Sequence, residues 1–182
     1  IGVAGSPIIR DPTTAWQPEH AVDYLVTEST YGDRAHPDRV AAKATFRDVI
    51  QRALDDGGKV LIPAFAIGRT QEILYELHQL VAAGACGKIP VVVDGPMAAQ
   101  ATEVYARHRG LYDEEAHATL AAGGHPLALD TLIIADDSRD SARAAALDGP
   151  AIIIAGSGMC NGGRIRGHLA RFLPDPRTDV LL

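Results

Sequence analysis

The chain has few cysteines and no sequence motif for binding a metal ion. Its 182 residues contain two cysteines, Cys86 and Cys160, which lie too far apart to form a metal-ligand pair. This sparse usage predicts a reduced, cytoplasmic setting. Neither H-x-H-x-D-H nor H-E-x-x-H occurs in the sequence, and Walker-type loops and nucleophile-elbow turns are also absent. The residues by themselves therefore supply no complete set of metal ligands.

Long apolar runs and an excess of positive charge are also missing. No run is long enough to cross a membrane and no signal peptide is recognisable, so we expect no membrane partner. The net charge of -6 argues against a protein that coats nucleic acid with a generally basic surface. A local basic cleft stays compatible with this charge, because electrostatic steering depends on where charges lie. The length suits one α/β domain with a substantial core.

Short apolar runs alternate with helical patterns along the chain. We expect strands over residues 23–28, 59–63, 89–93, 132–134 and 151–155. Helical spacing predicts helices over residues 39–54, 70–81, 97–108 and 138–147 and another from 165 onward. Residues 109–130 interrupt this rhythm and predict a helical excursion with a loop. Strands separated by single helices indicate an α/β fold with a doubly wound, mostly parallel sheet and helices on both faces.

Polar and glycine-rich turns follow each predicted strand. In a doubly wound sheet, ligands bind beyond the carboxyl ends of the strands, so these turns predict a crevice along one edge. The richest of them is the strand, glycine turn and helix start of residues 151–168. Glycines let a phosphate approach the backbone, and the start of a helix presents unpaired N–H groups to it. An anion site and a turn that merely reverses the chain are both compatible with this segment alone.

Several single residues are each compatible with two roles. Glu28 either orients a histidine or metal ligand or caps its own turn, and His36 is either catalytic or a surface residue at a helix start. Arg69 either contacts phosphate or is solvated. Asp94 either binds a metal or caps the helix after it. His168 either faces the cleft or is an exposed helix residue.

Four separated blocks of the sequence point to a known family. They are D-Y-L-V-T-E-S-T-Y-G-D-R at 23–34, I-P-A-F-A-I-G-R-T-Q-E at 62–72, V-D-G-P-M at 93–97 and G-S-G-M-C-N-G-G-R at 156–164. In this order they resemble the signature blocks of the β-CASP family, which comprises metallo-β-lactamase-fold nucleases that process RNA. The family includes the endonuclease subunit of the mRNA 3′-end cleavage machinery and its bacterial and archaeal relatives. The resemblance covers nearly the whole chain.

The resemblance implies an organisation in three parts. Residues 1–35 would be a remnant of the metallo-β-lactamase domain with the acidic motif A, residues 36–175 the β-CASP domain, and residues 176–182 the start of the return strand. The intact protein would be a zinc-dependent ribonuclease that hydrolyses RNA phosphodiester bonds with two zinc ions. The zinc ligands would lie outside this chain, so we expect the fragment to bind no metal and to be inactive alone.

The resemblance also implies roles for individual residues. Glu28 and His36 would be catalytic, with Glu28 supporting a histidine supplied by the lactamase domain. The residues that would contact the substrate are Ser29, Tyr31, Arg34, Phe65, Arg69, Ser157, Met159, Arg164 and His168. They would hold RNA phosphates through arginines and turn amides, so that this part of the protein acts as a lid.

The implied partners are single-stranded RNA and the metallo-β-lactamase domain of the same protein. A homodimer is a further expectation, because the apolar strand at 24–27 would lack its usual sheet and is free to pair with a second copy. Two other functions stay open: a noncatalytic nucleic-acid-binding or scaffold module of the same fold, and an α/β enzyme that binds a small phosphorylated molecule. The sequence does not distinguish exonuclease from endonuclease action or RNA from DNA.

Overall fold

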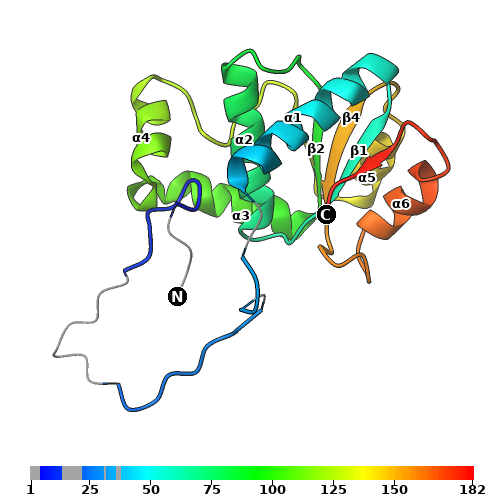
Figure 1. Ribbon diagram of the computed structural model, residues 1–182. Helices are drawn as coiled ribbons and strands as arrows, with labels where there is room; N and C mark the ends of the chain where they lie inside the picture. Colours follow the sequence, from blue (N-terminus) through cyan, green and yellow to red (C-terminus); the bar gives the residue numbers. More distant parts are fainter. Residues whose placement is uncertain (1–4, 14–21, 31, 36–37) are drawn as a thin grey trace.

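A computed structural model describes residues 5–13, 22–30, 32–35 and 38–182 (Figure 1). The helices in the described ranges are α1 (Arg39–Asp56), α2 (Arg69–Ala82), α3 (Pro96–Arg107), the short 3-10 helix η1 (Arg109–Leu111), α4 (Glu114–Ala121), α5 (Ser138–Ala145) and α6 (Ile165–Phe172). The strands are β1 (Lys59–Pro63), β2 (Val91–Asp94), β3 (Leu132–Ala135), β4 (Ala151–Ala155) and β5 (Asp179–Val180).

The strands form one parallel sheet in the order β3-β2-β4-β1-β5. β4 lies in the middle, where Ile153 pairs with Leu61 of β1 and with Val92 of β2. Every residue of β1, β2 and β4 is buried, which matches the near-continuous apolar runs of these strands. Because all five strands run the same way, the turns after β1, β2, β3 and β4 reach the same edge of the sheet.

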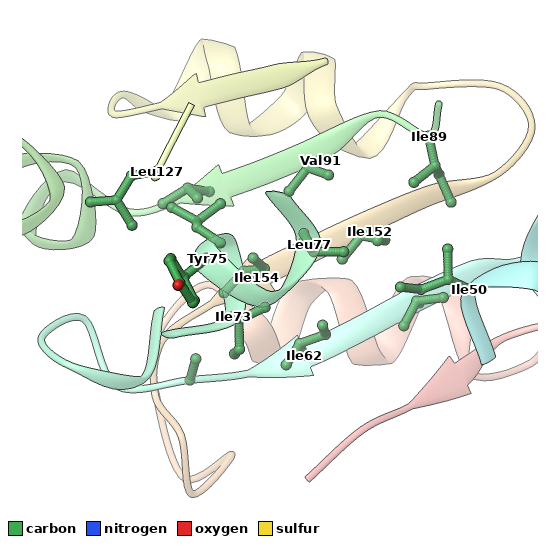
Figure 2. Packing of buried hydrophobic residues seen from close by; sticks show 14 of the residues in the cluster. Ile50, Ile62, Ile73, Tyr75, Leu77, Ile89, Val91, Leu127, Ile152 and Ile154 are labelled. Atoms are coloured by element: carbon green, nitrogen blue, oxygen red, sulfur yellow. The ribbon is translucent and has the colours of Figure 1, made fainter. Parts of the chain in front are cut away.

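Helices cover both faces of the sheet, because alternate strand residues point to opposite sides. On one face, Ile62, Val91 and Ile154 belong to a large cluster with buried residues of α1, α2 and α3 (Figure 2). On the other face, Leu61, Val92 and Ile153 belong to a smaller cluster with Ala144 of α5 and Ile165 of α6. The predicted doubly wound α/β fold is confirmed.

Aspartate side chains begin three of the helices. Asp38 accepts hydrogen bonds from two backbone N–H groups at the start of α1, Asp113 accepts one at the start of α4, and Asp137 accepts two at the start of α5. Each carboxylate satisfies donors that have no partner within the helix. Gly57 ends α1 in the left-handed conformation, with φ of 76°.

The prediction of a strand over residues 23–28 is wrong. This segment forms no strand in the described structure, and Tyr24 and Val26 are 91% and 94% exposed. A strand needs a neighbour for its backbone hydrogen bonds, and no strand of the described sheet pairs with this segment. Near the other end of the chain, β5 forms an edge of the sheet and pairs with β1, with Asp179 opposite Val60 and Val180 opposite Leu61.

The predicted excursion over residues 109–130 contains η1 and α4. Across the described ranges, no helix combines the length and the apolar character that crossing a membrane requires.

Candidate functional site

Two loops meet at the carboxyl edge of the sheet. The α2 loop (residues 64–68) follows β1, and the glycine-rich loop (residues 156–163) follows β4, the strand next to β1. The Ala64 N–H donates to the Ala155 carbonyl at 3.1 Å, where the loops begin. A Cβ atom on Gly158 would lie only 3.0 Å from the Phe65 ring. The loops are therefore in direct contact, and a larger residue at Gly158 would push them apart.

The glycine-rich loop is closed by its own hydrogen bonds. The Ser157 N–H donates to the Gly162 carbonyl at 3.2 Å, and the Ser157 hydroxyl donates to the Asn161 side-chain oxygen at 2.8 Å. The Ile165 N–H, at the start of α6, donates to the Gly156 carbonyl at 3.0 Å. These bonds fix both ends of the loop relative to β4 and α6.

Gly163 is the position in this loop where glycine is indispensable. Its φ is +71°, and a Cβ atom there would lie 2.2 Å from the Gly156 carbonyl oxygen. Neither the backbone conformation nor the space admits a side chain. The sequence pattern predicted a close backbone approach to a ligand in this loop, and at Gly163 the group that approaches is the loop's own carbonyl.

A buried carboxylate lies beneath the glycine-rich loop. Asp94, the last residue of β2, has no side-chain exposure (0%) and accepts hydrogen bonds from three side chains. The Ser141 hydroxyl, Arg164 Nη1 and His168 Nε2 each donate to it at 2.6 Å. Asp94 does not cap α3, and its oxygens are not free to bind a metal ion, because they accept hydrogen bonds from α5, the end of the loop and α6.

Burial raises the pKa of Asp94, but the hydrogen bonds from His168, Ser141 and Arg164 outweigh burial and bring the pKa below its ordinary value. The carboxylate is therefore ionised at neutral pH. An ionised carboxylate only accepts hydrogen bonds, so Nε2 of His168 carries a hydrogen. His168 is itself buried and stacks on Phe172 at a ring distance of 6.3 Å.

Arg164 also supports the end of a neighbouring strand. Its guanidinium donates to the Ala135 carbonyl at 2.9 Å and to the Asp136 carbonyl at 3.0 Å. Its side chain thus ties the glycine-rich loop to β2 and β3 together. Arg164 and His168 were both predicted to contact substrate, and the structure directs their polar groups to Asp94 and to backbone oxygens.

The α2 loop is held by a neutral side chain. Gln71 is fully buried, and its side-chain oxygen accepts a hydrogen bond from the Gly68 N–H at 2.8 Å. Its amide nitrogen donates to the Ala66 carbonyl at 3.1 Å and to the Thr102 hydroxyl at 2.9 Å. The side chain therefore links the loop to α3 and satisfies the backbone groups that the turn leaves unpaired.

Three exposed arginines lie at helix starts along this edge. Arg69 begins α2, Arg139 lies in the first turn of α5, and Arg166 lies in the first turn of α6. The first two form ion pairs within their own segments, with Glu72 at 3.4 Å and Asp137 at 3.1 Å. Exposed pairs of this kind contribute little to stability, so both guanidinium groups are free to exchange partners. Of these three, the predicted set included only Arg69. The available signals were that Arg139 follows a strand closely and that Arg166 follows the glycine-rich loop.

Exposed apolar side chains accompany these charges. Phe65 in the α2 loop is 58% exposed and Met159 in the glycine-rich loop is 73% exposed. Ile67 and Met97 are also largely exposed in the segments after β1 and β2. The edge thus presents cationic and apolar surface together, and the structure brings Phe65, Arg69, Ser157 and Met159 of the predicted set to it.

Glu28 lies in a different part of the molecule. Figure 1 shows the described segment before α1 running outside the body formed by the sheet and helices. Glu28 is exposed and accepts a hydrogen bond from the Thr30 N–H at 2.8 Å, and this bond lowers the pKa of the carboxyl. The contact is that of a carboxylate capping its own turn.

The other residues predicted near Glu28 share its segment. Ser29 and Arg34 are exposed, and Arg34 forms an ion pair with Asp33 at 3.2 Å. Tyr31 and His36 lie outside the described residues, so the predictions for them stay predictions. The structure therefore gives two separate sets of predicted site residues, one before α1 and one at the carboxyl edge.

Among the residues that the structure describes, no three His, Cys, Asp or Glu side chains are grouped as a metal site would require. The Asp94 and His168 pair is the nearest approach to a ligand set at the carboxyl edge, but the guanidinium of Arg164 is in contact with the same carboxylate. A cation there would meet this positive charge. The described residues therefore do not fit a zinc ion.

Comparison with known proteins gives a family match. The family model described as Beta-Casp domain matches residues 70–182, which include α2 from its second residue, the whole glycine-rich loop and the Asp94 cluster.

Curated relatives match most of this chain. It is 38% identical over 163 residues to "Ribonuclease TTHA0252" of Thermus thermophilus, which covers 87% of the chain and 36% of the relative. It is 32% identical over 163 residues to "Probable RNase MJ4" of Methanocaldococcus jannaschii, with 88% and 35% covered. It is 30% identical over 164 residues to "Transcription termination factor FttA" of Methanosarcina mazei, with 88% and 25% covered. The chain thus spans between a quarter and just over a third of these relatives.

Proposed function

The chain belongs to the β-CASP family, and on that basis we propose that it is the RNA-binding part of a zinc-dependent ribonuclease acting in RNA processing or decay. Relatives named as ribonucleases support the reaction class. The observation that carries the binding role is the carboxyl edge, where two loops in contact lie among exposed arginines at three helix starts.

The chemistry of this edge suits a polyanion with apolar bases. Arg69, Arg139 and Arg166 lie on three segments that follow strands of the sheet, and arginine side chains are common partners of phosphate oxygens. Phe65 and Met159 offer exposed apolar surface on the two loops of the same edge, on which the bases of a single strand can stack. A single-stranded RNA lying along the edge would use both kinds of contact at once.

In this proposal the chain binds and positions RNA. The zinc ions would be held by residues other than those described, since the described side chains do not form a ligand set. Glu28 and His36 keep their proposed catalytic roles, and Ser29, Tyr31 and Arg34 their proposed places near the reacting phosphate. The lactamase domain as the neighbour of this chain, a homodimer and a cytoplasmic location belong to the same proposal.

Binding of a labelled single-stranded RNA at about 50 mM and about 200 mM salt tests the proposal. We expect affinity to fall steeply with salt, and the triple variant Arg69→Ala, Arg139→Ala, Arg166→Ala to lower the salt slope by roughly one per arginine. Arg107→Ala is the matched control, because Arg107 is an exposed arginine paired with Glu103 at the far end of α3.

Two results would contradict the proposal. One is binding in the triple variant equal to that of Arg107→Ala, which would remove the carboxyl edge as the phosphate track. The other is equally tight, salt-insensitive binding of a mononucleotide, which would favour a small-molecule enzyme. A DNA strand of the same sequence, tested in parallel, measures the preference for RNA.

A further inference from the structure

Asp94 cannot touch a ligand at the surface, but it contacts three segments that surround the glycine-rich loop. Its side chain is fully buried at the end of β2. Ser141 reaches it from α5, Arg164 from the residue directly after the loop, and His168 from one turn further along α6. These partners are 47, 70 and 74 residues away in sequence, so the cluster joins parts of the chain that have no local connection.

We propose that Asp94 is a positioning residue that holds the glycine-rich loop in its ligand-binding conformation through Arg164 and His168. The identity of the ligand as RNA rests on the proposed function, whereas the positioning itself does not. RNA affinity would then depend on a carboxylate that never contacts RNA.

The geometry of the loop supports this role. The first residue of the loop continues β4, and the Gly156 carbonyl is bonded to the Ile165 N–H, so the loop closes on the start of α6. The position of α6 is in turn fixed at its polar side by Arg164 and His168, both on Asp94. Without that carboxylate, the base of the loop would rest on backbone bonds and on the burial of Ile165.

The charge of Asp94 is essential to this arrangement. A neutral amide has one acceptor oxygen, and its N–H₂ group would face either Arg164, which donates to one carboxylate oxygen, or Ser141 and His168, which donate to the other. An ionised carboxylate accepts from all three partners at once, and charge-assisted bonds are about twice as strong as neutral ones. Asp94→Asn therefore keeps the shape of the side chain and removes the function assigned to it.

A role in overall stability alone makes a different prediction. If Asp94 served only to stabilise the fold, its loss would speed opening of the whole domain and every slowly exchanging amide would be affected equally. If it positions the loop, the effect is concentrated in the loop. Native-state hydrogen exchange separates the two, because it reports opening residue by residue.

The experiment compares amide exchange and RNA binding in the 182-residue chain and in Asp94→Asn, Ser141→Ala and Asp113→Asn. The loop is reported by the N–H groups of Ser157, Cys160 and Ile165, which donate to loop carbonyls, and the sheet by the N–H of the buried Ile152 in β4, which donates to Pro90. Asp113→Asn is the matched control, since Asp113 caps α4 with a carboxylate and asparagine caps equally well.

In Asp94→Asn we expect the loop amides to exchange about tenfold faster relative to Ile152, with RNA affinity about tenfold weaker. Ser141→Ala leaves the contacts to Arg164 and His168 in place and gives a smaller change, and Asp113→Asn gives none in the loop. If Asp94→Asn does not fold, His168→Phe provides the test, because phenylalanine keeps a ring against Phe172 but has no donor, and the carboxylate stays. The same pattern with smaller amplitude is then expected.

Unchanged loop exchange, or equal acceleration of loop and sheet amides, would overturn the inference. A wild-type chain that binds no RNA would refute the proposed function, while the exchange pattern would still decide whether Asp94 positions the loop.

Discussion

The two loops of the carboxyl edge touch each other but are held by different chemistry. The α2 loop is held by Gln71, a neutral side chain that bonds to backbone groups within three to five residues and to Thr102. The glycine-rich loop is held by Asp94, a charged side chain whose partners come from α5, the loop end and α6. One support is local and neutral, and the other is long-range and ionic.

This difference has consequences for stability and for function. The loss of a neutral amide costs the desolvation of a few backbone groups, whereas the loss of the buried carboxylate leaves Arg164 without its counterion and His168 without its hydrogen-bond acceptor. The glycine-rich loop should therefore be the more sensitive of the two to mutation and to pH.

The largest effect is expected from Asp94→Ala. Removing one partner of a buried ionic pair typically lowers the free energy of unfolding by about 3 to 5 kcal/mol. We expect a loss toward the lower end of this range, because Arg164 is 29% exposed and keeps its bonds to the Ala135 and Asp136 carbonyls. Urea denaturation measures the change. A loss below about 1 kcal/mol, as found for exposed ion pairs, would show that Asp94 is not the anchor of this edge.

Gly163→Ala should come next, with a loss of about 3 kcal/mol from positive φ and steric overlap. The new Cβ atom would lie 2.2 Å from the Gly156 carbonyl oxygen. The matched variant is Gly68→Ala in the α2 loop, where φ is +84° but nothing lies within 4 Å, so a backbone cost of about 1 to 2 kcal/mol without steric overlap is expected. Equal losses in thermal unfolding would contradict the packing of the glycine-rich loop.

Gln71→Leu is predicted to cost about 2 kcal/mol, because the Gly68 N–H and the Ala66 carbonyl lose their buried partner. The loss should be the same at pH 4 and pH 7, since no titrating group takes part. A marked pH dependence in equilibrium unfolding would mean that the two supports are coupled.

The smallest effect is a pH dependence carried by Asp94. Its pKa in the folded chain lies below its ordinary value of 3.8, so its ionisation contributes stability above that pH and the contribution is lost as pH falls further. Wild type should exceed Asp94→Asn in unfolding free energy at pH 7, and the gap should narrow as acid is added. Exposed carboxylates such as Asp175, whose pKa is about 2 because of Arg177, affect both proteins equally. A gap that widens in acid would contradict the assignment.

Continuous apolar runs predicted the sheet, and the reason is that β1 and β4 are buried on both faces. The run at 24–27 is also rich in apolar and β-branched residues but lies exposed, because no strand of the described sheet pairs with it. Sequence composition reports the tendency to form a strand and does not report whether a partner is present. Helix starts were predictable within one or two residues from their aspartate caps and from the proline that begins α3.

The site was predictable as an edge and only in part as a set of residues. Strand order placed the glycine-rich loop and Arg69 at one edge, as the structure shows. The cluster of Asp94, Arg164 and His168 was not predictable from the sequence. Arg164 and His168 lie 70 and 74 residues after Asp94, and their pairing with it depends on the strand order β3-β2-β4. An arginine beside a glycine turn looks the same in sequence whether it binds phosphate or a buried carboxylate.

The most direct test of the account is a photo-crosslink between a single-stranded RNA containing 4-thiouridine and this chain, with the modified residues located by mass spectrometry. We expect adducts in the α2 loop and the glycine-rich loop, at Phe65 or Met159, which are exposed at the carboxyl edge. Adducts confined to α1 or α4, with both loops unmodified, would contradict it.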